Sequence, residues 1–192
     1  MKKFAYIIRI LTVAPLMALV MLLVLYTHPQ FFGSTAVFLL VVLFLVIFPL
    51  LGYPLQRFIP KYKDKGRDGQ RALAFIFAVA GYILGCLVAI FLPTPRNVLI
   101  IYFSYLLSGS ITMAINKLFH FKASGHACGI TGPFTLLVYF GSAAGYIGIP
   151  VLALAWLSSI HMKRHTHLQL LVGALIPFAA LGLITAFLAI IG

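Results

Sequence analysis

The sequence predicts an all-α fold: a polytopic membrane helix bundle with six to seven transmembrane helices, formed by residues 1–192 as a single integral membrane domain. Hydrophobic residues make up 63% of the 192 positions and charged residues only 8%, whereas soluble domains carry about 25% charged residues. A soluble globule could not bury so much apolar surface, so lipid must surround most of the chain. A chain of this length suits one compact bundle rather than several domains.

Long apolar runs give the positions of the expected spans. A helix that crosses a membrane needs about 20 mostly apolar residues. Five such runs lie near 5–26, 33–55, 72–92, 98–116 and 167–191. Two shorter runs, near 126–141 and 145–159, are separated by the segment Gly-Ser-Ala-Ala-Gly, which is typical of a tight turn between two short helices. We therefore expect seven spans, or six if the sixth run, near 145–159, does not cross the membrane.

The basic residues are distributed asymmetrically between the expected loops. The chain has 14 Lys and Arg but only 2 Asp and Glu, which gives a net charge of +12. If the N-terminus is inside, the inner segments are 1–4, 56–71, 117–125 and 160–166. These segments hold every Lys and Arg except Arg9 and Arg96. The positive-inside rule then places the N-terminus and these loops in the cytoplasm, with the protein in the cell membrane. Because the basic residues lie between apolar runs, we expect no nucleic acid partner and favour anionic membrane lipids instead.

Two of the inner segments carry most of the polar side chains. The first runs from Asn116 to His126 and the second from Ser158 to Gln169, and together they contain five of the six histidines. Ionisable residues at membrane depth are costly and are usually functional. Because two spans separate the segments, both are expected on the same face of the membrane.

These residue types suit the binding and attack of a phosphate. Lys and Arg neutralise phosphate oxygens, and Ser124, Gly125 and His126 begin a helix whose free N–H groups and dipole favour an anion. His126 and His165 can divide the work, with one attacking phosphorus and the other protonating the leaving alkoxide. The only two carboxylates of the chain lie together in another loop. We therefore expect no metal and no other cofactor, and a phosphohistidine intermediate.

Each of these side chains also has an ordinary structural interpretation when it is considered alone. A loop histidine is usually an interfacial polar residue, and a Lys near a helix end usually anchors at the headgroups. Ser124 would serve equally as an N-cap. The catalytic interpretation is favoured because His126 and His165 each begin a spanning helix on the same face.

The same residues resemble the type 2 phosphatidic acid phosphatase (PAP2) superfamily of lipid phosphatases and vanadium haloperoxidases. The family pattern is K-x6-R-P, then P-S-G-H, then S-R-x5-H-x3-D. The second part is present as Ser124-Gly125-His126, and the third as Ser158, His165 seven residues later and Gln169 four residues beyond. The resemblance covers about residues 98–190, which would form the family-like core of the bundle.

The resemblance implies a role for each motif residue. His165 would be the nucleophile, His126 would protonate the leaving group, and Gln169 would orient His165. The groups expected to hold the phosphoryl oxygens are Lys117, Lys122, Ser124, the Gly125 N–H, Ser158 and Arg164.

The sequence departs from the family pattern at three points. No K-x6-R-P is present, so Lys117 and Lys122 are the candidates for the first-motif cation. Ser159 stands where the family has Arg, and we expect the neighbouring Arg164 to supply the missing charge. Gln169 stands where the family has Asp. An amide oxygen can accept a hydrogen bond from an imidazole N–H, but it cannot stabilise an imidazolium by charge, so activity could be reduced.

Three classes of function are considered for this sequence. The favoured one is a membrane lipid phosphatase, a hydrolase that cleaves a phosphomonoester or diphosphate of an isoprenoid or glycerolipid. The alternative is a catalytically weak or inactive relative that binds lipid phosphates, and the missing Arg and Asp favour it. A small transporter or channel is disfavoured because the middles of the spans lack ionisable residues and the sequence shows no inverted repeat.

The predicted orientation can be tested by cysteine labelling in intact cells. Single cysteines placed at 60–68 should react with a membrane-impermeant reagent only after the cells are opened, whereas a cysteine at Arg96 should react from outside. The reason is the gathering of basic residues on one side. Labelling of 60–68 from outside would reverse the topology.

Overall fold

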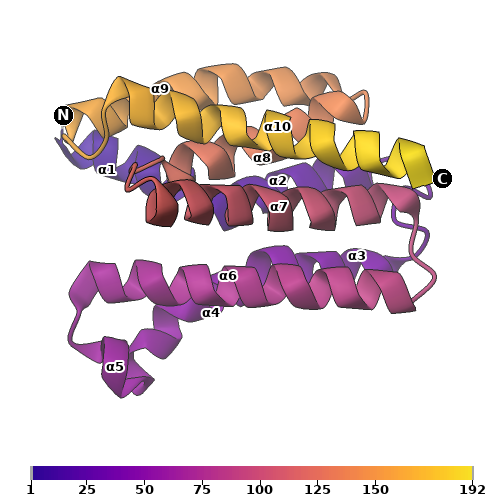
Figure 1. Cartoon of the computed structure of the whole chain (residues 1–192), viewed down its shortest axis with the longest axis horizontal. Helices are drawn as coiled ribbons and strands as arrows, with labels where there is room; N and C mark the ends of the chain where they lie inside the picture. The colour runs from indigo at the N-terminus through magenta and orange to yellow at the C-terminus, as the bar shows by residue number, and fades with distance from the viewer. Residues whose placement is uncertain (1, 192) are drawn as a thin grey trace.

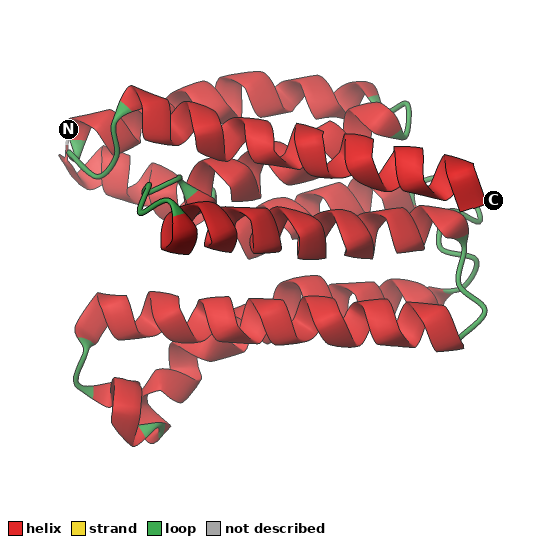
Figure 2. Cartoon of the chain, in the orientation of Figure 1, coloured by secondary structure: helices red, strands yellow, loops and turns green. Residues whose placement is uncertain are grey.

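The computed structural model describes residues 2–191, and every regular element in this range is a helix (Figure 2). The predicted all-α class is confirmed. The helices are α1 Lys2–Leu11, α2 Ala14–Tyr26, α3 Thr35–Val42, η1 Leu43–Ile47, α4 Phe48–Leu55, η2 Gln56–Phe58, α5 Pro60–Lys63, α6 Gly66–Phe91, α7 Arg96–Leu118, α8 Gly125–Tyr139, η3 Ala143–Ile147, α9 Gly148–His161 and α10 His167–Ile191.

The long helices lie along a common axis and have the length and composition of membrane spans (Figure 1). Five continuous spans are found among the described residues: 35–58, 66–91, 96–118, 143–161 and 167–190. A sixth arises if α1 and α2, which are bent by 51° relative to each other, count as one. The chain is therefore a polytopic helix bundle. The predicted run 126–141 forms α8, whose 15 residues fall short of the roughly 20 that a full crossing needs.

The bundle has two layers (Figure 1). One layer contains α3, η1, α4 and α6, in which α6 packs against α4 and η1. The other contains α1, α2 and α7 to α10, in which α10 packs on α7 and α8, and α2 packs on α8. Glycines allow the helix backbones to approach closely, as is usual in membrane bundles. A Cβ added at Gly52 would lie 2.4 Å from the Cα of Ala74, and one at Gly81 would lie 2.3 Å from the carbonyl oxygen of Phe44.

The first apolar run is divided at Thr12 and Val13. Val13 has extended backbone angles, and Pro15 lies in the first turn of α2. A proline has no N–H for the preceding turn and its ring clashes there, so a continuous helix through 14–15 is disfavoured. Because of this bend, α1 leaves the direction of α2 and packs against α9 instead.

The polar segments 56–66, 119–124 and 162–166 lie at one end of the bundle, which we name the basic end (Figure 1). The backbone N–H of Ser124 donates to the carbonyl of Gln169 at 2.9 Å, so the two histidine-bearing loops meet as the count of spans predicts. One expected boundary was wrong. The loop expected at 56–71 ends at Gly66, and Arg67 and Arg71 belong to the first turns of α6.

The contact between α8 and α10 yields a test at Gly173. A Cβ there would lie 2.3 Å from the backbone oxygen of Ser124, whereas one at Gly182 of the same helix would have no neighbour within 4 Å. Gly173→Ala should therefore lower the free energy of unfolding by about 1–3 kcal/mol, the scale of overpacking, and should displace the start of α8. Gly182→Ala is the control and should be neutral. Thermal unfolding in detergent measures both, and equal stabilities would contradict the proposed contact.

Candidate functional site

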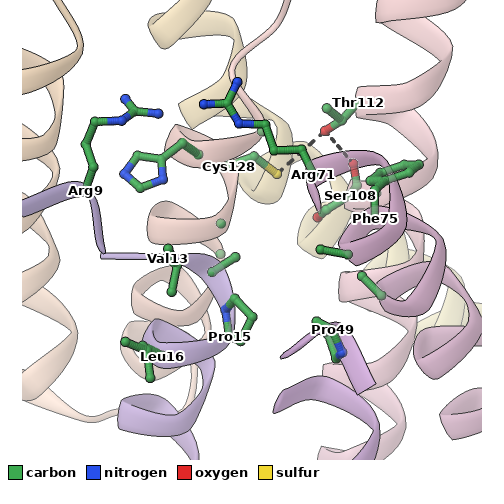
Figure 3. Close-up of a pocket in the computed structure, with 18 of the residues that line it drawn as sticks. Arg9, Val13, Pro15, Leu16, Pro49, Arg71, Phe75, Ser108, Thr112 and Cys128 are labelled. Atoms are coloured by element: carbon green, nitrogen blue, oxygen red, sulfur yellow. Dashed lines mark hydrogen bonds between the residues drawn. The ribbon is translucent and has the colours of Figure 1, made fainter. Parts of the chain in front are cut away.

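A cavity of about 1100 Å³ opens at the basic end between the two layers (Figure 3). Its polar part is lined by basic side chains and histidines from α1, α6, α8 and the two loops. They are Arg9, Arg67, Arg71, Lys122, His126, Lys163, Arg164 and His165. The rest of the cavity is lined by apolar side chains such as Val13, Leu16, Leu50 and Phe75, together with hydroxyl side chains of α7 and α8. The cavity is therefore amphipathic.

The N-terminus of α8 lies at this cavity, and its backbone is accessible at Gly125. Ser124 is fully buried, and its hydroxyl caps the helix by accepting the N–H of Ala127 at 3.3 Å. Gly125 lines the cavity, and nothing lies within 4 Å of the place a Cβ would take. The loop before it is fixed by Asn116, whose side-chain oxygen accepts the N–H of Ala123 at 2.6 Å. A ligand can thus approach the helix N-terminus at Gly125, while Ser124 serves as the cap.

His126 is held by a residue of the first helix. Its Nε2 lies 3.0 Å from the Thr12 hydroxyl, and that hydroxyl donates to the carbonyl of Ile8 at 2.7 Å. A hydroxyl has one proton to donate, so in this contact Nε2–H of His126 donates and Thr12 accepts. His126 therefore presents a protonated Nε2 to an oxygen atom.

His165 is held by Gln169, as the spacing of the motif predicts. Its Nδ1 lies 3.3 Å from the side-chain oxygen of Gln169, which also accepts the N–H of Thr166 at 3.1 Å. Since an amide oxygen only accepts, Nδ1–H donates, and the neutral ring then carries its lone pair on Nε2. Burial lowers the pKa of His165, partly offset by the hydrogen bond to Gln169. The ring is thereby kept in the neutral form that a nucleophile requires.

Arg9 belongs to the site, although its position in an apolar run gave it no role in the sequence. Its Nη1 donates to the Ser159 hydroxyl at 2.7 Å, and Ser159 donates in turn to the carbonyl of Ala155 at 2.8 Å. Arg164 is tied to Ser159 through its backbone N–H, 3.0 Å from the Ser159 carbonyl. The guanidinium that contacts Ser159 is thus that of Arg9, and not that of the neighbouring Arg164. The signal for it was an arginine inside a membrane span, which is costly unless functional.

Arg67 and Arg71 also line the cavity, from the opposite layer. Arg67 donates to the Tyr6 hydroxyl, and its guanidinium lies 4.7 Å from the centre of the Tyr6 ring. Arg71 lies 3.7 Å from Asp68 in an exposed pair. Both were expected in a cytoplasmic loop as lipid anchors. Their position one helical turn apart at the start of α6 directs them to the cavity instead.

The remaining predicted residues divide into two groups. Lys122, Gly125 and Arg164 line the cavity with the two histidines. Lys117 is exposed on the last turn of α7 and is not part of the lining. Ser158 is buried and donates to the carbonyl of Ala5 at 2.7 Å, so it holds α1 against α9 instead of facing the cavity.

The cavity carries a large excess of positive charge. Within residues 2–191 the ion pair of Arg71 with Asp68 is the one salt bridge found, and no group of three or more His, Cys, Asp or Glu in the described range could hold a metal ion. Neither Asp64 nor Asp68 lines the cavity. Cations that are partly removed from water without counter-ions favour an anionic ligand.

Comparison of the chain with protein-family models, with curated proteins and with solved structures gave no match. The family resemblance therefore rests on the motif residues and their spacing.

Proposed function

We propose that the protein is a membrane lipid phosphatase that works without a metal, through a phosphohistidine intermediate. One observation carries the proposal: His126 and His165 come from separate loops and line the same cavity, together with basic side chains that have no carboxylate among the lining residues. Cations and helix N–H groups bind phosphate, and two imidazoles can perform nucleophilic and acid–base steps on it.

The amphipathic lining supports a lipid as the substrate. Basic side chains at the mouth would hold the phosphate, and the apolar part among Val13, Leu16, Leu50 and Phe75 would hold hydrocarbon. Ligand pockets usually have volumes of about 300–1,000 Å³, so a cavity of about 1100 Å³ has room for a headgroup and part of a chain. A phosphomonoester or diphosphate of an isoprenoid or glycerolipid meets both requirements.

The hydrogen bonds of the two histidines suit different roles in the reaction. Nε2 of His165 would attack phosphorus and form an N–P bond while the bond from phosphorus to the lipid oxygen breaks. His126 would take up a proton when the anionic substrate binds beside it, and as an imidazolium it would donate its Nε2 proton to that oxygen in place of the Thr12 hydroxyl. Water would then attack the phosphohistidine, giving up a proton to His126 as the N–P bond breaks. Phosphate leaves, and both rings return to their starting forms.

Cations around the reacting group would stabilise the transition state. Lys122, Arg164 and the Gly125 N–H lie on the cavity wall, where preorganised donors act on developing charge with little interference from water. The positive-inside rule supports a cytoplasmic location for the basic end, with the protein in the cell membrane. Anionic lipids would then surround the cavity mouth.

A catalytically weak or inactive lipid-phosphate-binding protein is the second candidate. The observation that favours it is Gln169, which contacts His165 through a neutral oxygen. A carboxylate at this place would stabilise the imidazolium that forms during the reaction, and an amide does not. Binding of phosphate by the cavity cations would be unaffected.

Phosphate release from a panel of lipid phosphates in detergent tests the function. The purified protein should hydrolyse at least one of phosphatidate, an isoprenyl phosphate or an isoprenyl diphosphate. His165→Ala should reduce the rate by at least about 10³-fold, as loss of a nucleophile does. His161→Ala is the matched control, because His161 lies at the same end but is exposed and outside the cavity lining. If no lipid releases phosphate with the native protein, the binding protein becomes the better conclusion.

The pKa of His165 predicts the acid side of the pH profile. A nucleophilic imidazole must be neutral, and burial places the pKa of His165 below its ordinary value of about 6.5. The pH at which kcat/KM falls to half of its plateau should therefore lie below about 6.5. Gln169→Glu puts a carboxylate beside Nδ1–H, which stabilises the charged form and raises the pKa.

The measurement is kcat/KM against pH for the native protein and Gln169→Glu. The variant should begin to lose activity at a pH higher by about one unit or more. If the variant loses activity at the same pH as the native protein or at a lower pH, His165 is not the group whose protonation causes the loss.

A further inference from the structure

Arg9, Arg71 and Arg164 form a cluster of like charges around the histidines. Arg164 and Arg71 are the charged neighbours of Arg9, and Arg9 and Arg71 are those of His126. Bringing guanidinium groups together at a partly buried site costs electrostatic and desolvation energy. The neighbouring Asp68 contacts Arg71 alone, in an exposed pair. The cluster therefore favours the binding of an anion from outside the chain.

Arg9 is anchored in a way that leaves most of its donors free. A guanidinium has five N–H groups, and the one hydrogen bond found for this side chain within residues 2–191 runs from Nη1 to Ser159. Ser159 is fully buried and is fixed by its own bond to the carbonyl of Ala155. The remaining N–H groups of Arg9 stand on the cavity wall as a preorganised planar fork, the geometry that binds two phosphate oxygens at once.

Arg71 faces Arg9 from the other layer of the bundle. Figure 3 shows the two guanidinium groups extending toward each other from opposite sides of the pocket, Arg9 from α1 and Arg71 from α6. Neither helix carries a histidine of the site. The two layers are in direct contact beside these arginines, where Arg67 of α6 donates to the Tyr6 hydroxyl of α1.

We propose that Arg9 and Arg71 hold the phosphate of the substrate from the two layers of the bundle, with Arg9 supplying the charge at the position of Ser159. This inference rests on the proposed function for its substrate, although the binding of inorganic phosphate tests it separately. Arg9 acts as a catalytic residue, because it contacts the phosphoryl oxygens on which charge develops. The N-terminal segment, outside the region that carries the motifs, is therefore a part of the active site.

The test compares Arg9→Gln, Arg71→Gln and the double variant with the native protein. Each single variant should lose about 10²-fold or more in kcat/KM, the scale for one preorganised donor. Inhibition by inorganic phosphate should weaken about tenfold in each. Since both side chains hold one group, the double variant should lose less than the product of the two single effects. Arg57→Gln is the control, because Arg57 is exposed at the same end and outside the cavity lining.

Arg9→Lys is the control for a folding defect, because lysine keeps the positive charge but lacks the planar guanidinium group. It should bind phosphate more weakly than the native protein and more tightly than Arg9→Gln. Native kcat/KM and native phosphate inhibition in Arg9→Gln would overturn the proposal.

If the proposed phosphatase activity is not found, the binding of phosphate by Arg9 and Arg71 can still be tested. If the native protein hydrolyses none of the lipids, its thermal unfolding is measured with and without inorganic phosphate, since a ligand of the folded state raises the unfolding temperature. Stabilisation of the native protein by phosphate, with loss of the effect in Arg9→Gln and Arg71→Gln, supports the binding of phosphate by these two arginines. No stabilisation, or equal stabilisation of all three proteins, overturns it.

Discussion

The site depends on the close contact between the start of α8 and α10. The N–H of Ser124 donates to the carbonyl of Gln169, and Gly173 allows the backbone of Ser124 to lie where any side chain would collide. This contact brings the His126 end of α8 to the turn in which Gln169 orients His165. In a lipid-surrounded bundle, buried backbone groups must find partners within the protein, so the loss of this junction would separate the two histidines and leave polar groups unpaired.

The bend between α1 and α2 adds a second constraint. Because α1 turns away from the bundle axis at Val13 and packs on α9, it reaches residues that are about 150 positions away in sequence, through Ser158 to Ala5 and Arg9 to Ser159. The bend therefore explains how an early apolar segment contributes to a site whose recognisable motifs lie near the C-terminus.

Hydropathy and spacing predict the parts of this structure that depend on local sequence. Apolar runs give the helices, the number of spans between the polar loops gives their common end, and a separation of four residues gives the contact of His165 with Gln169. The placement of Arg9 and Arg71 on one cavity comes from tertiary packing, and the sequence offered only the presence of an arginine inside a span as a signal for the first of them. The shortness of α8 follows from the cap at Ser124 and the turn after Tyr139, in agreement with the short apolar run at 126–141.

The neutral side chain of Gln169 has a consequence for the whole cavity. A carboxylate there would stabilise the imidazolium of His165, and it would stand behind a ring whose charged neighbours are Lys122 and Arg9. Gln169 itself does not line the cavity, and neither aspartate does, so the lining holds cations and no carboxylate. With an amide at position 169, the proposed nucleophile would lose the support of a negative charge, while an incoming anion would meet no negative charge among the lining residues.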